Sequence, residues 1–167
     1  MGASTDVGCG PSLYSLSQAP EAAMTDALRK HFADYAAFHT TAGNKACHSF
    51  GIPIIVLSLL ALLARVPLVT LGGFELTLAE LVIALFVLYY LTLDATLARV
   101  MFVAYAALDA AGRFIPPLPA LGLFVFGWIL QGVGHWVYEK NSPAFFRNFV
   151  HLAVGQLWIL AKALGRA

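Results

Sequence analysis

Residues 51–64 of the chain read GIPIIVLSLLALLA, an apolar run without a charged side chain. Counted from Ala46, the apolar segment approaches the roughly 20 residues that a helix needs to cross a bilayer before it meets Arg65. This segment therefore predicts a transmembrane helix.

The composition of the whole chain also indicates a protein that lies in a lipid bilayer. Hydrophobic residues make up 60% of the 167 positions, charged residues only 11%, and the mean hydropathy is +0.78. A soluble domain of this length needs more polar surface. The net charge of +1 suggests no nucleic-acid partner, and the two cysteines, Cys9 and Cys47, predict no structural disulfide.

We predict an all-α fold: a polytopic membrane helix bundle of about four or five transmembrane helices, preceded by an amphipathic helix from about Thr25 to Thr41. Four spans are assigned to residues 46–64, 76–93, 95–112 and 119–138. A loop from Val66 to Glu75 joins the first two spans. The last apolar segment, Phe145 to Leu164, could span, re-enter or lie in the interface.

Residues 1–25 contain Gly, Ser and Pro but lack the apolar core of a signal peptide. We expect them to form a disordered N-terminal tail. Residues 26–167 would then form a single integral-membrane helical domain.

The basic residues predict an orientation. With the four spans above, both termini lie on one side, together with eight of the ten Lys and Arg residues: Arg29, Lys30, Lys45, Arg99, Lys140, Arg147, Lys162 and Arg166. The other side carries only Arg65 and Arg113. The positive-inside rule therefore predicts a multi-pass protein with cytoplasmic termini, in the inner membrane of a bacterium or the endoplasmic reticulum of a eukaryote.

A second stretch, GWILQGVGHWVYEK at residues 127–140, carries Gln131, His135 and Glu139 at four-residue spacing. On an α-helix these side chains lie on one face. Polar groups are costly in hydrocarbon, so the row indicates a protein interior, a cavity or a metal site.

Two further histidines, His39 and His48, are nine residues apart, which on one continuous helix would put them on opposite faces. Gly43 as a C-cap and Asn44 as the next N-cap would break the helix and let both imidazoles meet. The spacing is not a known metal signature. A histidine in an apolar helix is more often a hydrogen-bonded core residue than a ligand, and both readings stay open at this point.

Two motifs together resemble a known family. The first is Tyr35-x3-His39-x4-Asn44-x3-His48, followed by Gly51 and Pro53. The second is Gly127-Trp128 with Gln131-x2-Gly134-His135-x2-Tyr138-Glu139-Lys140-x2-Pro143-Ala144. In order and spacing they are similar to small polytopic membrane proteins typified by the fungal 2-hydroxy fatty acid dioxygenase of α-oxidation. The resemblance covers roughly residues 30–155.

The resemblance implies an Fe(II)-dependent dioxygenase that uses O2 to shorten a 2-hydroxy fatty acid by one carbon within the bilayer. The matching metal ligands are His39, His48 and His135, whereas His31 and His151 fall outside the pattern. Three histidines on an octahedral ion leave about three positions open. The carboxylate and hydroxyl oxygens of the substrate would take two of these positions, and O2 the third.

Five more residues receive expected roles. Glu139 would be a fourth ligand, or an acceptor that orients a histidine. Tyr35 and Gln131 would hydrogen-bond substrate or oxygen, Asn44 would hold the helix junction at the substrate, and Lys140 would meet the carboxylate. The turn at residues 40–43 departs from the Asn-Pro-rich turn usual in the family.

Other functions fit the same residues. A zinc-dependent membrane lipid hydrolase would use a tetrahedral site with one water and would work without oxygen. A non-enzymatic scaffold or lipid-binding protein would use its histidines only for bonds between helices. A haem protein with paired histidine ligands is a further alternative, which a red colour on purification would reveal.

Overall fold

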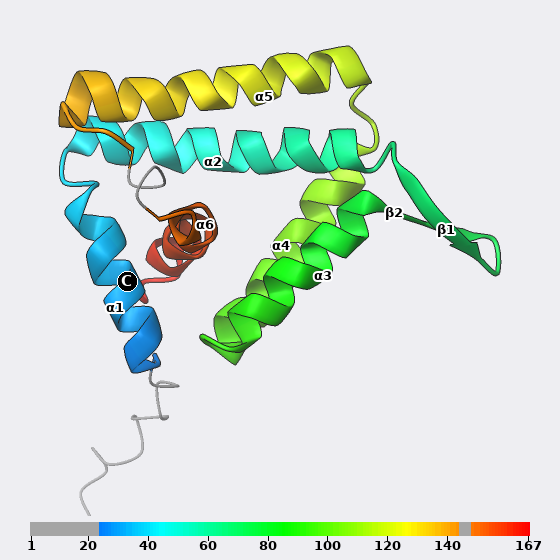
Figure 1. Ribbon diagram of the computed structural model, residues 1–167, viewed down its shortest axis with the longest axis horizontal. Coiled ribbons are helices and arrows are strands. Elements are labelled where there is room, and N and C mark those ends of the chain that lie inside the picture. The colour runs from blue at the N-terminus through cyan, green and yellow to red at the C-terminus, as the bar shows by residue number, and fades with distance from the viewer. Residues whose placement is uncertain (1–23, 144–147) are drawn as a thin grey trace, which may run out of the picture.

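The computed structural model describes residues 24–143 and 148–167 (Figure 1). The expected tail, residues 1–25, lies outside the described residues except for its last two, and so does the start of the last expected segment, up to residue 147. The described part folds into six α-helices, a π-helical extension and a β-hairpin. The predicted all-α membrane bundle is confirmed, with the hairpin as an addition; the division into a tail and one domain stays a prediction.

The first two helices, α1 (Asp26–Ala37) and α2 (Ala42–Leu63), are separated by a turn over residues 38–41. The Thr41 side chain caps α2, because its oxygen accepts a hydrogen bond from the Asn44 N–H at 3.3 Å. The predicted break at Gly43 and Asn44 is therefore misplaced, since both residues lie inside the first turn of α2. Threonine is itself a good N-cap, so the cap can lie three residues earlier than predicted.

Helix α2 packs along α5 (Pro117–Gly132), and the two run in opposite directions (Figure 1). Glycines allow the close contact. A Cβ added to Gly127 would lie 2.6 Å from Ile55 Cγ1 and 3.1 Å from the Gly51 carbonyl oxygen. Small residues are typical of such helix contacts in membranes, where close backbone approach replaces the hydrophobic driving force.

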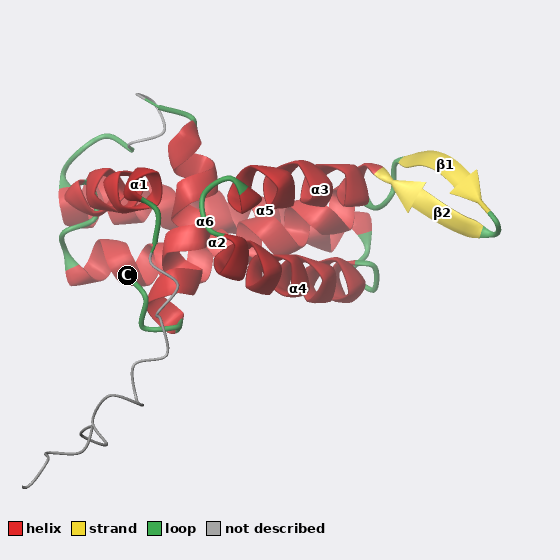
Figure 2. Ribbon diagram, turned by 90° about the horizontal axis from the view of Figure 1, so that it is seen from below, coloured by secondary structure: helices red, strands yellow, loops and turns green. Residues whose placement is uncertain are grey.

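A β-hairpin follows α2, where the sequence was expected to form a loop from Val66 to Glu75. Strand β1 (Pro67–Leu71) pairs antiparallel with β2 (Phe74–Thr77), and the hairpin projects from one end of the helical body (Figure 2). The turn residues Gly72 and Gly73 have φ angles of 57° and 85°. The expected loop is wrong because two glycines in left-handed conformation supply a two-residue hairpin turn.

Helices α3 (Leu78–Leu91) and α4 (Ala95–Gly112) pack against each other. Helix α3 begins with a capping box, in which Thr77 and Glu80 satisfy each other's backbone N–H groups. Residues 76 and 77 belong to the hairpin and residues 92 and 93 to the turn after α3, so the expected span 76–93 is reduced to a helix of 14 residues.

Three helices among the described residues are long and apolar enough to cross a membrane: α2, α4 and the continuous helix from Pro117 to Glu139. Helices α3 and α6 (Val150–Ala163) have 14 residues each, about 21 Å at 1.5 Å per residue. That is below the roughly 17 residues of the shortest usual transmembrane helix and well short of a hydrocarbon core of about 30 Å. Three of the predicted spans thus have sufficient length, and α3 and α6 do not.

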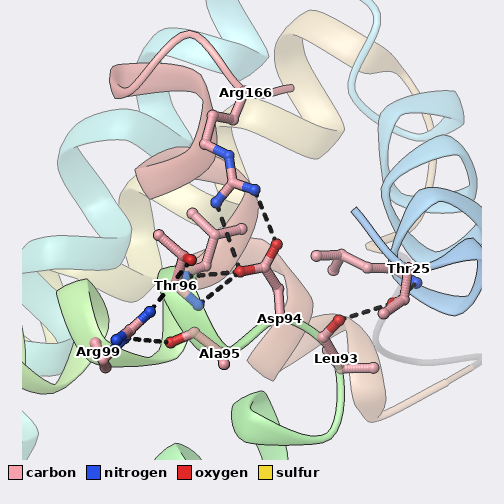
Figure 3. Close-up of polar contacts among 9 residues, drawn as sticks. Thr25, Leu93, Asp94, Ala95, Thr96, Arg99 and Arg166 are labelled. Carbon is pink, nitrogen blue, oxygen red and sulfur yellow. Dashed lines mark hydrogen bonds and ion pairs between the residues drawn. The ribbon is translucent and has the colours of Figure 1, made fainter. Parts of the chain in front are cut away.

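Asp94 ties the α3–α4 turn to the residues that follow α6 (Figure 3). Its Oδ1 accepts the backbone N–H groups of Thr96 at 2.8 Å and Leu97 at 2.9 Å, and Oδ2 accepts from Arg166 Nη2 at 3.0 Å. Burial favours a higher pKa for the Asp94 carboxyl, but the Leu97 N–H and the Arg166 guanidinium hold this pKa below its usual value. The carboxylate therefore both caps α4 and joins two distant segments.

We expect Asp94→Ala to lower the free energy of unfolding by about 1–2 kcal/mol, because α4 loses its cap. Asp94→Asn keeps a capping oxygen and should cost less. Thermal unfolding of the detergent-solubilised protein, followed by circular dichroism, measures both variants. Equal losses in the two variants would show that the ion pair, and not the cap, carries the effect.

The interior lies where α1, α3, α4 and α6 meet. Its fully buried side chains include Leu28, Tyr90, Leu97 and Leu157. The Tyr90 hydroxyl donates to the Ala153 carbonyl at 2.8 Å and so joins α3 to α6. This packing holds α6 beside α1, next to the turn that carries His39.

Candidate metal centre

Three buried histidines from three parts of the chain meet at one point: His39 from the α1–α2 turn, His48 from α2 and His135 from the π-helical segment η2 (Val133–Glu139). The ring centroids are 4.4 Å apart for His39 and His48, 5.0 Å for His39 and His135, and 4.8 Å for His48 and His135. One nitrogen from each ring lies within 4.8 Å of the other two. The turn between α1 and α2 thus brings His39 and His48 together, as the broken-helix prediction requires.

Backbone carbonyls orient two of the rings. The His39 Nδ1–H donates to the Tyr35 carbonyl at 2.6 Å, and the His48 Nδ1–H donates to the Asn44 carbonyl at 3.0 Å. A carbonyl oxygen only accepts, so Nδ1 carries the hydrogen in both rings and Nε2 keeps a free lone pair. This tautomer is typical of histidines that bind a metal through Nε2.

The donor set fits a metal ion. His39 Nε2 and His135 Nδ1 are buried and have no hydrogen-bond partner among the described residues. Burial lowers the pKa of the His39 imidazole to about 4, so the ring is neutral at pH 7 and can donate its lone pair. Buried polar atoms without partners are unfavourable, and a cation bound by the three imidazoles would satisfy them.

The segment that carries His135 is not an ordinary α-helix. From Val133 to Glu139 the helix has π-type winding, with i to i+5 hydrogen bonds in place of i to i+4. A π-turn therefore takes about one more residue than an α-turn. The row expected on one face is split: Gln131 and His135 face the same cavity, and Glu139 does not.

Glu139 holds the α1–α2 turn. Its Oε1 accepts the backbone N–H of Thr40 at 2.9 Å and the Thr40 hydroxyl at 2.5 Å. Its Oε2 accepts the backbone N–H of Thr41 at 3.1 Å and the Thr41 hydroxyl at 2.9 Å. We expected Glu139 to bind the metal or a histidine, but these four bonds join the end of η2 to the turn beside His39.

Tyr35 and Gln131 both line the cavity at the histidines. The Tyr35 ring stacks on His39, with centroids 3.9 Å apart and planes 14° apart. Burial raises the pKa of the Tyr35 phenol, so the hydroxyl stays protonated. The Gln131 Nε2 is buried and has no hydrogen-bond partner in the described part of the chain.

Asn44 and Lys140 do not line this cavity. Asn44 is fully buried and acts through its backbone carbonyl, which orients His48. Lys140 is exposed and ends η2 in the left-handed conformation, with φ at 54°.

His151 reaches the cavity from α6, outside the histidine cluster. Its Nε2–H donates to the Asp34 carboxylate at 2.8 Å, which joins α6 to α1. His31 is half-buried on α1 and does not line the cavity. Both histidines stand apart from the three clustered ones, as expected.

Three residues that support the site were not predicted: Asp34, Thr40 and Thr41. The departure of the turn at residues 40–43 from the Asn-Pro-rich pattern is the signal that could have identified the two threonines, since their hydroxyls bind Glu139. Asp34 carries no comparable signal, because its partner His151 lies 117 residues away.

Comparisons with known proteins agree on one family. Residues 25–167 match the family described as 2-hydroxy-palmitic acid dioxygenase Mpo1-like. The 2-hydroxy-palmitic acid dioxygenase MPO1 of Saccharomyces cerevisiae is 31% identical over 127 residues, which cover 76% of this chain and 73% of the yeast protein. No solved structure matches the chain.

Proposed function

The chain belongs to the Mpo1-like family of 2-hydroxy-palmitic acid dioxygenases, and from this membership we propose that it is an Fe(II)-dependent dioxygenase that shortens 2-hydroxy fatty acids by one carbon. The observation that carries the proposal is the cluster of His39, His48 and His135, buried at the end of an apolar cavity. A site for an oxygen-dependent reaction on a lipid needs both features.

His39, His48 and His135 would hold the iron. Imidazole suits Fe(II), and three protein ligands leave positions open. When bound, iron would supply the oxygen activation and the sites for the hydroxyl and carboxylate oxygens of the substrate. The carbonyls of Tyr35 and Asn44 accept the Nδ1–H groups of His39 and His48. The Nε2 atoms of both rings therefore stay unprotonated and keep a lone pair that would bind the iron.

Other residues of the cavity would bind the polar end of the substrate. The Tyr35 hydroxyl and the Gln131 amide are donors that line the cavity beside the histidines. Lys140 is exposed at the end of η2, so it would attract the anionic carboxylate before binding. Asn44 would act by positioning His48, and Glu139 by holding the turn that carries His39.

The proposed reaction balances without a further reductant. A 2-hydroxy acid, RCH(OH)COOH, and O2 yield RCOOH, CO2 and water. The bond between C1 and C2 breaks, and C2 becomes the new carboxyl carbon. An unsubstituted fatty acid carries no oxygen on C2 and could offer only its carboxylate to a bound metal, so it should not react.

The apolar helices would place this chemistry in a membrane. We infer a multi-pass membrane protein from α2, α4 and the Pro117–Glu139 helix. Cytoplasmic termini, with eight basic residues on one side and two on the other, require the 14-residue α3 to cross as well, since three crossings alone would put the termini on opposite sides. The endoplasmic reticulum of a eukaryote or the inner membrane of a bacterium fits this arrangement.

Metal analysis of the purified protein, paired with assays on 2-hydroxypalmitate in air and under nitrogen, tests the function. We expect stoichiometric iron and formation of pentadecanoic acid only in the presence of oxygen. Zinc with oxygen-independent activity would favour the hydrolase. A metal-free protein that leaves the substrate unchanged would favour the scaffold.

A further inference from the structure

The cavity at the histidines continues as an apolar passage along α2. It has a volume of about 200 Å³, and its polar end is formed by the three histidines with Tyr35 and Gln131. Away from the histidines its walls are mostly apolar and come from four helices: Ile52, Val56 and Leu59 of α2, Phe86 of α3, Phe124 and Trp128 of α5, and Leu152 with the polar Gln156 of α6. One polar end and apolar walls are the features of a site for an amphiphile.

A second cavity, of about 40 Å³, adjoins the first. The two share Val56, Leu59, Phe86 and Gln156 as lining residues. The second cavity continues to Leu60 of α2, Val82 and Ile83 of α3, and Tyr105 of α4. Together the two cavities form a passage from the histidines to the contact of α2 with α3 and α4.

The length of this passage suits one acyl chain. Eleven residues separate His48 from Leu59 on α2, which corresponds to about 17 Å at 1.5 Å per residue. Half of a bilayer's hydrocarbon core, the depth filled by one layer of lipid chains, is about 15 Å. A long alkyl tail that starts at the histidines would therefore end near Leu59, Leu60 and Ile83.

We propose that this passage holds the alkyl tail of the 2-hydroxy fatty acid and that Ile83, at its far end, sets the longest chain accepted. This inference rests on the proposed function for the identity of the ligand. Ile83 is 7% exposed and Tyr105 is 4% exposed, so the end is closed by packed side chains. The Tyr105 hydroxyl donates to Gln156 Oε1 at 2.6 Å, which fixes the tyrosine across the passage.

A different apolar groove supplies the alternative path. It has a volume of about 440 Å³, lies on α5 and η2 and is lined by Val125, Ile129, Val133 and Trp136, with Phe124 and Trp128 between it and the inner cavity. Val125, Ile129 and Trp136 are at least 50% exposed, so this groove faces outward. An alkyl tail in this groove would lie against lipid, and no residue of α3 would limit its length.

Chain-length profiles test the inference. We expect Ile83→Ala to raise kcat/KM for 2-hydroxyeicosanoic acid relative to 2-hydroxypalmitic acid by roughly tenfold, the effect of about one methylene in an apolar pocket. Val56→Phe, at the junction of the two cavities, should lower kcat/KM for 2-hydroxypalmitic relative to 2-hydroxydecanoic acid by a similar factor. Ratios are taken within one preparation, so a partial loss of folded protein does not change them.

Matched controls are Leu81→Ala and Leu57→Phe, which lie on the same helices but line neither cavity. Their profiles should equal that of the unchanged protein. If the unchanged protein oxidises no 2-hydroxy acid, the proposed function fails. If it is active but Ile83→Ala and Val56→Phe keep its profile, the passage is not the tail site and the function stands.

Photo-crosslinking provides a readout without turnover. The full chain is incubated under nitrogen with 2-hydroxypalmitate that carries a diazirine at its terminal carbon, then irradiated and digested. We expect the label on α3, at Val82 or Ile83, or on α2, at Leu60. Label confined to Val125, Ile129 or Trp136 would place the tail in the outer groove and overturn the inference.

Discussion

His48→Ala is expected to abolish stoichiometric iron binding and the oxidation of 2-hydroxypalmitate. The ring is buried at the centre of the cluster, 4.4 Å from His39 and 4.8 Å from His135 between ring centroids. Without it, two imidazoles remain, and no other histidine lies near enough to replace it in the cluster formed by the described residues. His39→Ala and His135→Ala should have the same effect.

Iron content per chain, measured by mass spectrometry on the purified variants, checks this expectation without an activity assay. A chelator should lower the melting temperature of the unchanged protein and leave that of His48→Ala in place, since a bound metal stabilises only the folded form that holds it. His31→Ala and His151→Ala are the controls and should retain iron. Full iron content in any of the three cluster variants would refute the ligand assignment.

Glu139→Gln is expected to weaken iron binding by roughly 10- to 100-fold, the usual cost of changing a residue that supports a metal ligand. The carboxylate accepts four hydrogen bonds from Thr40 and Thr41. A glutamine replaces one accepting oxygen by an NH2 group, which faces the N–H donors of the turn. The turn that places His39 then loses its attachment to η2, and the loss should appear in the iron Kd more than in kcat at saturating iron.

Titration of the chelator-treated protein with Fe(II) under nitrogen measures this Kd. Glu75→Gln, which changes an exposed glutamate on the hairpin, is the matched control and should leave the Kd unchanged. Thr40→Val and Thr41→Val remove the two hydroxyl donors and should each give a smaller loss than Glu139→Gln. An unchanged Kd in Glu139→Gln would mean that the turn keeps His39 in place without the carboxylate.

Much of the fold could be predicted because a long apolar segment directly indicates a helix that lies in lipid. The expected spans 46–64 and 119–138 correspond to α2 and to α5 with η2, and the expected span 95–112 coincides with α4. The wrong predictions concern the ends of helices and the segment after α2, where a few turn or capping residues determine the structure. Thr41, instead of Asn44, caps α2, and the Gly72–Gly73 turn makes a hairpin from what was expected to be a loop.

The residues of the candidate site could be predicted from the sequence, but their arrangement in space could not. His39, His48 and His135 stand out because each interrupts or adjoins an apolar segment, and the family resemblance names them. Spacing on an ideal α-helix could not place Glu139, since the π-winding from Val133 turns its carboxylate to Thr40 and Thr41. The pairing of Asp34 with His151 could not be read from either local segment.

The sequence by itself determined that the helices lie in lipid, that the fold is helical, and which residues supply the three imidazoles. Hydropathy, helix length and residue chemistry are local properties of the chain. Only the tertiary structure decided that these imidazoles meet within 4.8 Å, that Glu139 holds a turn, and that two cavities join along α2. These features depend on how all six helices pack. Packing is set by contacts between residues far apart in sequence, for which a local pattern carries no signal.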